Sequence, residues 1–394
     1  MEIDALGTAF ETRFGTAPTH LVRVPGQVTL LGEELAFHGL PTLALALGRE
    51  VRLALRVRGD GEVNVRDLRP GGGEVSFEVG VDIQVDPRDP TVSLLTEPAR
   101  ILARRLAAWQ GFDAVLASDV PSGLGAQAAL RVAVGLTLAE VGELGLGPTA
   151  LAELLAEPVE ATERGEARAA HAVCLGARTG SAVAVAQDPL RTRAVMLPAD
   201  WRVVVASMGP GGSERPPAWA GRRRSECMAA LTEVGRTLVS SGRTPEAPGS
   251  WAALFHSLGG PRRALGVGQR VLGGSQLKRF RHLATEAERT REARDALLVA
   301  DPHTFGTLMD ACHGSLRGDY LVSSAGLDTL AAAALEGGAR GAHLTGNGGW
   351  VVALADVGTV EGVVETLRTH GPGADPEVFV AEPAPGASLA PFPG

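Results

Sequence analysis

Asp119-Val-Pro-Ser-Gly-Leu-Gly-Ala-Gln-Ala-Ala-Leu-Arg-Val-Ala-Val134 is the stretch around which the rest of this chain is organised. An apolar run at 114–117 precedes it and predicts a strand. The proline and the two glycines predict a tight turn, and the residues after the turn predict a helix over 126–140. Leu130, Val134 and Leu138 recur every four residues and give that helix an apolar face.

The start of this helix is a candidate anion site. A glycine-rich turn that enters a helix presents backbone N–H groups without partners inside the helix, and the helix dipole adds positive potential there. The turn has neither a Gly-x-Gly-x-x-Gly pattern nor the Lys-Ser/Thr ending of a P-loop, so a connection that binds nothing remains the alternative. The candidate nucleotide-binding residues are Pro121, Gly123, Gly125, Ala126 and Gln127.

The composition is that of an ordinary globular protein. The 394 residues suffice for two lobes with separate cores, and 45% hydrophobic against 21% charged residues excludes a disordered chain. A net charge of −8 argues against nucleic-acid or anionic-membrane partners. No leader pattern and no membrane-length apolar run stands in the sequence, which predicts neither secretion nor a membrane span. Cys174, Cys227 and Cys312 have no disulfide or metal spacing, which favours a cytoplasmic location.

Strand patterns dominate the first half of the chain and helical patterns the second. We expect a helix over 5–14 and two strands within 21–34 that are interrupted at Pro25-Gly26. Separate strands are expected at 43–47 and 51–57, and a single helix over 148–166. The Gly- and Pro-rich segment 210–217 indicates a domain boundary or a lid. Together these patterns predict an α+β protein with an N-terminal lobe over 1–207 and a C-terminal lobe over 208–394.

Several motifs stand in order along the chain, at 25–36, 121–129, 222–227, 281–286, 313–320, 341–349 and 383–387. In this order they resemble the motifs of the galactokinase family of the GHMP kinase superfamily. Pro25-Gly-Gln-Val-Thr-Leu-Leu-Gly-Glu-Glu-Leu-Ala36 is similar to the family's Pro-Gly-Arg-Val-Asn-Leu-Ile-Gly-Glu-His-Thr-Asp. The stretch 121–129 is similar to its Pro-x-Gly-x-Gly-Leu-Ser-Ser-Ser-Ala-Ala motif. Further similar stretches are 222–227, 281–286, 313–320, 341–349 and 383–387.

This resemblance implies both a fold and an activity. The fold is the two-lobed GHMP kinase fold, with a ribosomal-protein-S5-like N-terminal lobe and a ferredoxin-like C-terminal lobe. The activity is transfer of the γ-phosphoryl group of ATP, with Mg²⁺, to the C1 hydroxyl of galactose.

The chain departs from the family at the positions that carry this chemistry. Where the opening motif has an arginine that stabilises the transferring phosphate, this chain has Gln27, and a neutral amide cannot offset the developing charge. The family's Cys-Gly-x-Met-Asp-Gln stretch is matched by 174–179, which places Arg178, or Thr179 if the alignment shifts by one, at the catalytic aspartate. Neither side chain can act as that carboxylate. The phosphate-type loop is two residues shorter than the family's and lacks its serines, for which Gln127 is a poor substitute.

The candidate substrate-binding residues are Glu33, Glu34, Gly346 and Asn347. The family's sugar-binding Glu-His-Thr-Asp is Glu-Glu-Leu-Ala at 33–36, which keeps the first carboxylate only. The alternative for the two glutamates is a solvated turn pair, and the alternative for 346–349 is a tight strand connection. We expect Arg178 either to form a surface salt bridge or to occupy the old catalytic pocket, where it would pair with Glu33 or Glu34 or bind an anion.

Two functions from different classes follow. One is an ATP-dependent small-molecule kinase for galactose or for an altered substrate, and the other is a non-catalytic descendant that binds a ligand or regulates. Because several catalytic groups are replaced together, weak or absent galactokinase activity is predicted. The expected partner is a small molecule, either a sugar or an anion. The oligomeric state does not follow from the sequence.

Overall fold

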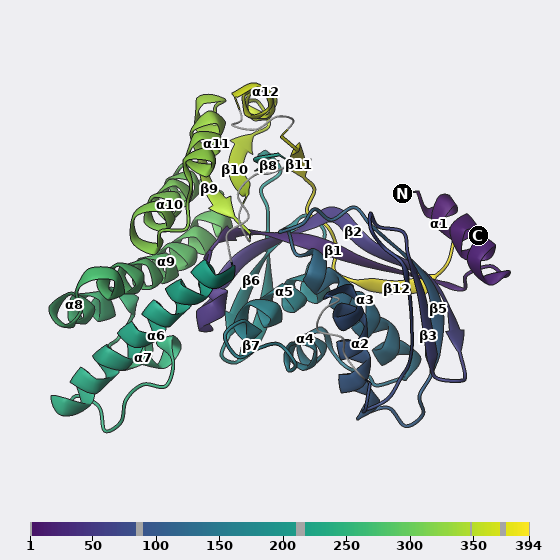
Figure 1. The fold of residues 1–394 in the computed structure, drawn as a ribbon. Helices are drawn as coiled ribbons and strands as arrows, with labels where there is room; N and C mark the ends of the chain where they lie inside the picture. Colours follow the sequence, from purple (N-terminus) through teal and green to yellow (C-terminus); the bar gives the residue numbers. More distant parts are fainter. Residues whose placement is uncertain (1, 84–89, 210–216, 347–348, 371–375, 394) are drawn as a thin grey trace. The chain divides into compact units, whose positions relative to one another are not determined.

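The structure, a computed structural model, describes residues 2–83, 90–209, 217–346, 349–370 and 376–393 (Figure 1). The chain forms two compact units that interleave in sequence. Unit 1 comprises 1–27, 46–179 and 383–394, and unit 2 comprises 28–45 and 180–382. In this grouping residues 28–45 and 180–207 belong with the C-terminal half, and the lobes expected at 1–207 and 208–394 stay a prediction.

A mixed sheet forms the framework of unit 1. Its strands lie in the order β12-β1-β2-β5-β3-β4, with β3 parallel to β5 and the pairs β1–β12, β2–β5 and β3–β4 antiparallel. The strands are β1 (His20–Leu31), β2 (Thr42–Arg58), β3 (Glu62–Asp67), β4 (Glu74–Glu78), β5 (Gly111–Ser118) and β12 (Ser388–Pro391). The first part of β2 continues into unit 2, where it pairs with β6 (Ser181–Gln187), and β6 pairs with β7 (Leu190–Met196).

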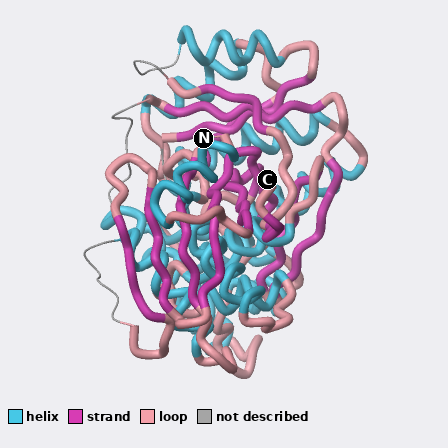
Figure 2. The backbone as a smooth tube through the Cα atoms, turned by 90° about the vertical axis from the view of Figure 1, so that its right-hand side faces the viewer, coloured by secondary structure: helices cyan, strands magenta, loops and turns pink. Residues whose placement is uncertain are grey.

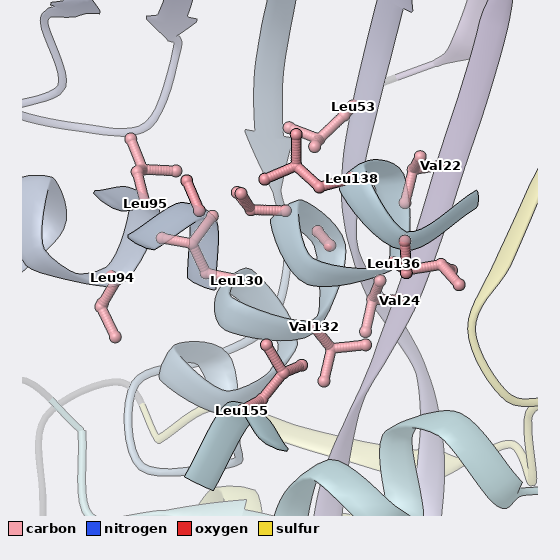
Figure 3. Packing of buried hydrophobic residues seen from close by; sticks show 14 of the residues in the cluster. Val22, Val24, Leu53, Leu94, Leu95, Leu130, Val132, Leu136, Leu138 and Leu155 are labelled. Atoms are coloured by element: carbon pink, nitrogen blue, oxygen red, sulfur yellow. The ribbon is translucent and has the colours of Figure 1, made fainter. Parts of the chain in front are cut away.

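Helices cover both faces of this sheet. One face packs on α2 (Pro90–Ala103), α3 (Ala126–Val141), α4 (Pro148–Ala156) and α5 (Arg164–Gly176), and these helices share the large apolar cluster shown in Figure 3. The apolar face expected for the central helix is confirmed, since Leu130, Val134 and Leu138 are buried. The other face packs on α1 (Ile3–Phe14) through Leu6 and Phe10.

Three expectations about the elements of the first half are wrong. Pro25 and Gly26 do not interrupt a strand, because β1 is continuous from His20 to Leu31. The patterns at 43–47 and 51–57 belong to one long strand, β2, since the polar residues between them stay within the ladder. The helix expected over 148–166 is two helices, α4 and α5, separated by turns at 157–163.

Unit 2 contains a four-stranded antiparallel sheet in the order β11-β8-β10-β9. Counted along the chain, its strands β8 (Trp201–Ser207), β9 (Gly341–Thr345), β10 (Trp350–Asp356) and β11 (Val378–Ala381) have the order 4-1-3-2. With helices between the first and second strands and between the third and fourth, this is the ferredoxin-like arrangement expected for the C-terminal lobe. Figure 2 shows these strands in magenta and the helices in cyan.

A long helical insertion joins β8 to β9, and a single helix, α12 (Val360–His370), joins β10 to β11. The insertion consists of α6 (Pro217–Ser240), α7 (Trp251–Ser257), α8 (Pro261–Val271), α9 (Gly274–Leu298), α10 (Pro302–Ser315), the π-helical turn Leu316–Tyr320 and α11 (Ala325–Glu336). Residues 210–216 of the expected boundary or lid lie outside the described residues, and Pro217 begins α6. Within the described part of the chain, no helix is long and apolar enough to cross a membrane.

Candidate functional site

The glycine-rich loop joins β5 to α3 in unit 1. Gly123 and Gly125 have φ of +87° and +83°, a left-handed conformation that glycine adopts without the strain of a side chain. Gly125 is the N-cap of α3, and its cap position has no side-chain hydrogen bond. Ala126 therefore begins a helix whose first N–H groups lie at an end of positive potential. The loop expected from the sequence is present with this geometry.

The remaining predicted residues of the loop differ in exposure. Pro121 and Ala126 are half-buried, and Gln127 is exposed on the first turn of α3. Ser122, also exposed, is the sole hydroxyl residue in 119–128. The backbone of this loop fits a phosphate group, since its donors are N–H groups at a helix start. None of the described residues forms a cluster of three or more His, Cys, Asp or Glu that could hold a metal ion. A magnesium ion bound with ATP keeps mainly phosphate and water ligands, so its position would follow that of the nucleotide.

Gln27 lies directly on this loop. Its backbone N–H donates to Leu124 O at 2.9 Å. A Cβ atom added at Gly125 would lie 2.8 Å from Gln27 Cγ, so the glutamine side chain packs on the last residue of the turn. Gln27 therefore contacts the glycine-rich loop, and its amide brings no charge to it.

The stretch that carries Arg178 is held beside the opening motif. The Cys174 thiol donates to Pro25 O at 3.2 Å, which ties the end of α5 to the residues just before Gln27. Burial raises the pKa of this thiol to about 12, so Cys174 stays a neutral donor. Arg178 follows the C-cap of α5 and is exposed, as is Thr179. The expected pair of Arg178 with Glu33 or Glu34 stays a prediction, because Arg178 belongs to unit 1 and the glutamates to unit 2.

Glu33 and Glu34 are buried in unit 2, with 8% and 7% of their surface exposed. A solvated turn pair is therefore the wrong interpretation of these glutamates. The Thr345 hydroxyl donates to Glu33 Oε2 at 3.3 Å, and Glu34 has a positive φ of 68°. The next two residues, Leu35 and Ala36, are buried in the core.

Side chains of α9 hold the backbone that carries Glu33. Glu286 Oε1 accepts the Gly32 N–H at 2.8 Å, and the Arg289 Nε–H group donates to Glu286 Oε2 at 2.7 Å. Burial raises the pKa of Glu286, but the Arg289 charge and the hydrogen bonds outweigh it and leave that pKa below its usual range. Glu286 is thus a buried carboxylate that accepts a hydrogen bond from a backbone N–H and forms an ion pair with an arginine.

His282 adds a second bond from α9 to this turn. Its Nε2 lies 3.3 Å from Glu33 O, and its Nδ1 lies 2.9 Å from Ser315 Oγ. A neutral ring satisfies both contacts, with Nε2–H donating to the carbonyl and the serine hydroxyl donating to Nδ1. Burial lowers the pKa of His282 to about 4, which agrees with the neutral form.

The loop 346–349 joins the antiparallel strands β9 and β10. Gly346 and Gly349 have φ of +66° and +88°, and the Met208 N–H donates to Gly349 O at 2.9 Å. A ligand contact of Gly346 stays a prediction. Asn347 lies outside the described residues.

The sequence analysis did not identify the residues that hold the turn at Gly32 and Glu33. The stretch 281–286 contributed to the resemblance, yet neither His282 nor Glu286 was given a role. A histidine and a glutamate four residues apart on one helix face were the available signal. Thr345 and Ser315 carried no signal, because their partners lie far away in the sequence.

Comparison with solved structures first defines the class of protein. A Lactococcus lactis galactokinase in complex with galactose matches with a TM-score of 0.81 and 21% identity, covering 98% of this chain and 99% of that one. The mevalonate kinase of L. major, in complex with R-mevalonate, matches with a TM-score of 0.59 at 18% identity, covering 94% and 97%. These similarities show the GHMP kinase fold.

Sequence relatives then narrow the class. A sequence model of the galactokinase galactose-binding signature matches residues 8–57. The galactokinase of Chloroflexus aurantiacus is 32% identical over 377 residues, covering 93% of this chain and 91% of the relative. That of Roseiflexus sp. is 30% identical over 371 residues, covering 92% and 90%. The chain belongs to the galactokinase family.

Proposed function

We propose that this protein keeps the phosphate-binding loop of its family, binds ATP there, and transfers phosphate to galactose far more slowly than its enzymatically active relatives. The observation that carries the proposal is the contact of Gln27 with the loop through Leu124 and Gly125. The loop keeps the backbone geometry that recognises phosphate, whereas the side chain beside it has no charge for the transition state.

The size of the expected loss follows from electrostatics. Positioned charges and donors near a transferring phosphoryl group act in a partly dehydrated site, and removing one typically costs about 10²–10³ in rate. Arg178 at the family's aspartate position removes the group that accepts or orients the hydroxyl proton as well. Because such groups act together, their losses do not add, and either one alone is enough to suppress turnover.

The positions that correspond to the family's sugar-binding residues also differ, in a way that weakens galactose binding. Of the four motif positions 33–36, Glu33 alone keeps the family's carboxylate, and Leu35 and Ala36 are core residues. An apolar side chain cannot replace hydrogen bonds to a sugar hydroxyl, and loss of such bonds typically costs about 1–3 kcal/mol each. Weak galactose affinity is therefore expected under the same proposal.

Calorimetry tests the binding of ATP at the loop, and a coupled assay tests the slow transfer of phosphate to galactose. Titration with ATP and Mg²⁺ should show saturable binding, whereas galactose should show none at millimolar concentration. Galactose-dependent ADP release should be many orders below the usual enzyme range of about 1–10³ s⁻¹. Turnover within that range contradicts the catalytic half of the proposal, and absence of ATP binding contradicts the loop half.

Restoration of the two family residues is a sharper form of this test. Gln27→Arg with Arg178→Asp should raise ADP release above the wild-type level, while either change alone should not. Full family rates are not expected, since the loop stays two residues short and lacks the serines. Gln27→Met, of similar length but without charge, and Arg104→Asp, at an exposed arginine elsewhere in unit 1, are the matched controls.

A further inference from the structure

The glycine-rich loop leaves the sheet of unit 1 at an unusual hydrogen-bonded pair. The ladder between β2 and β5 ends at the pair Val51–Ser118, so Glu50 and Asp119 stand next in register. In a hydrogen-bonded antiparallel pair the two residues exchange both backbone bonds. Here the Asp119 N–H donates to Glu50 O at 3.1 Å, but the Glu50 N–H donates to Asp119 Oδ1, at 2.5 Å, instead of to the Asp119 carbonyl.

The substitution of a side-chain oxygen for a backbone oxygen has a geometric consequence. Because the carboxylate satisfies the Glu50 N–H, just beyond the end of the ladder between β2 and β5, the carbonyl of Asp119 need not stay in the plane of the sheet. The chain can then turn away at Val120, whose N–H donates to Ser118 Oγ at 3.2 Å. The direction in which the loop departs is thus set at Asp119.

An ion network holds this carboxylate in place. The Arg52 Nη2 group lies 3.2 Å from Asp119 Oδ2, and Arg52 Nε lies 3.1 Å from Glu50 Oε2. Arg23 makes a two-pronged contact with Glu50 at 2.8 and 2.9 Å. Two acids and two arginines therefore balance in charge, and the Glu50 and Arg52 side chains are only 8% and 14% exposed. The Glu50–Arg52 pair is thus shielded from water, whereas the Asp119 and Arg23 side chains that extend the network are 31% and 47% exposed.

The far end of the loop is fixed by the neighbouring strand. Gln27 N–H holds Leu124 O, and Gly26 approaches Val120 so closely that an added Cβ would lie 2.5 Å from Val120 Cγ1. The loop is consequently supported both by the β1 backbone and by the hydrogen bond between Asp119 and Glu50 of β2.

We propose that Asp119 is a positioning residue, which fixes the glycine-rich loop in its anion-binding conformation. Its side-chain carboxylate, in place of its backbone carbonyl, accepts the hydrogen bond from the Glu50 N–H. The consequence for ATP affinity rests on the proposed function, whereas the consequence for loop order does not. Asp119 itself is not proposed to touch the ligand.

The test compares Asp119→Ala with Asp119→Asn. Alanine removes the acceptor for the Glu50 N–H and should weaken ATP binding about tenfold in calorimetry. It should also speed hydrogen exchange of the amides at 120–126, measured without nucleotide. Asparagine keeps an oxygen at the Oδ1 position and loses only the charge toward Arg52, so it should restore both readouts to within about threefold of wild type.

Asp113→Asn is the matched control. Asp113 lies on β5, the strand that precedes Asp119, and bridges Arg56, Arg58 and Asn64 in a second ion network, so its replacement perturbs the sheet away from the loop. It should lower Tm without changing exchange at 120–126. If Asp119→Ala does not fold, Asp119→Ser, whose shorter side chain cannot reproduce the bond, takes its place with the same expectations.

Unchanged exchange at 120–126 in the alanine or serine variant overturns the proposal. So does equal loss of ATP affinity in the alanine and asparagine variants, because that pattern indicates a role for charge alone. If the wild-type protein does not bind ATP, the proposed function fails, and the exchange comparison still decides whether Asp119 positions the loop.

Discussion

Gly125 is the residue whose identity is most tightly constrained in the loop. Its φ of +83° strains any side chain, and an added Cβ would lie 2.8 Å from Gln27 Cγ. Gly125→Ala should therefore lower the free energy of unfolding by about 1–2 kcal/mol and abolish ATP binding, as measured by urea unfolding and calorimetry.

Gly147 provides the control for this change. It also caps a helix of unit 1, α4, but its φ is −69° and an added Cβ meets nothing within 4 Å. Gly147→Ala should change stability by about 1 kcal/mol at most and leave ATP binding intact. Equal effects of the two substitutions would show that the strain at Gly125 does not shape the loop.

Glu286 is the corresponding residue of unit 2. It is fully buried, accepts the Gly32 N–H and pairs with Arg289, so its removal leaves two buried donors without their acceptor. Glu286→Ala should lower the free energy of unfolding by about 3–5 kcal/mol in urea titrations. Glu292→Ala, on the same helix but with surface ion pairs to Arg262 and Arg291, should cost no more than about 1 kcal/mol. A small loss at Glu286 would contradict its role in holding the Glu33 turn.

At the scale of elements, local patterns predicted the fold where one periodicity ran without interruption. The helix after the loop was expected over 126–140 and observed as Ala126–Val141, because its apolar residues keep a helical period throughout. An error arose where a proline and a glycine interrupt the pattern. Pro25 and Gly26 were interpreted as a strand break, yet Gly26 serves a close approach to Val120 inside a continuous strand. A glycine that is needed for tertiary contact cannot be distinguished by sequence from one that is needed for a turn.

The C-terminal strand β12 is an element whose contribution can be measured. Ser388–Pro391 pairs with β1, and the Phe392 N–H donates to Thr19 O at 2.9 Å. The Phe392 ring packs on Gly7 of α1, where an added Cβ would lie 3.0 Å from Cε1. Phe392→Ala should lower the free energy of unfolding by about 1–3 kcal/mol, because the ring covers the small cluster under α1.

Thermal unfolding followed by circular dichroism checks this expectation. Pro393→Ala, at the exposed neighbouring position, is the control and should leave Tm unchanged. A Tm unaffected by Phe392→Ala would mean that β12 and α1 do not depend on each other.

At the scale of the whole molecule, the family was accessible from the sequence, since it depends on ordered motifs, and the loss of catalytic residues at Gln27 and Arg178 stays a prediction. The hydrogen bonds that hold the candidate site in place could not be predicted from the sequence. Glu286 with Gly32, His282 with Ser315 and Thr345 with Glu33 each join residues far apart in the chain, and polar residues of these types usually lie on surfaces. Only the fold shows that they are buried and that they satisfy one another.

Buried neutral histidines in both units give the molecule a common response to acid. Burial is the first cause that lowers the pKa of His38 to about 3, of His171 to about 3 and of His282 to about 4. The usual histidine pKa is about 6.5, so the unfolded chain binds more protons than the folded chain between that pH and about 4. Stability is therefore complete above pH 6.5 and is lost as the pH falls. Each histidine contributes a slope of about 1.4 kcal/mol per pH unit.

Urea unfolding at pH 7.5, 6.5, 5.5 and 4.5 should show this loss, with a slope approaching about 4 kcal/mol per pH unit for the three rings together. His171 offers the cleanest variant, because its Nε2 has no hydrogen-bond partner among the described residues and its Nδ1 lies 3.4 Å from Ala152 O. An apolar side chain can replace such a ring with little loss at neutral pH. His171→Leu should thus leave stability at pH 7.5 nearly unchanged and reduce the slope by about 1.4 kcal/mol per pH unit. A slope that is the same in the variant and the wild type would mean that His171 titrates alike in the folded and unfolded chain, contrary to its burial on α5 beside Ala152 of α4.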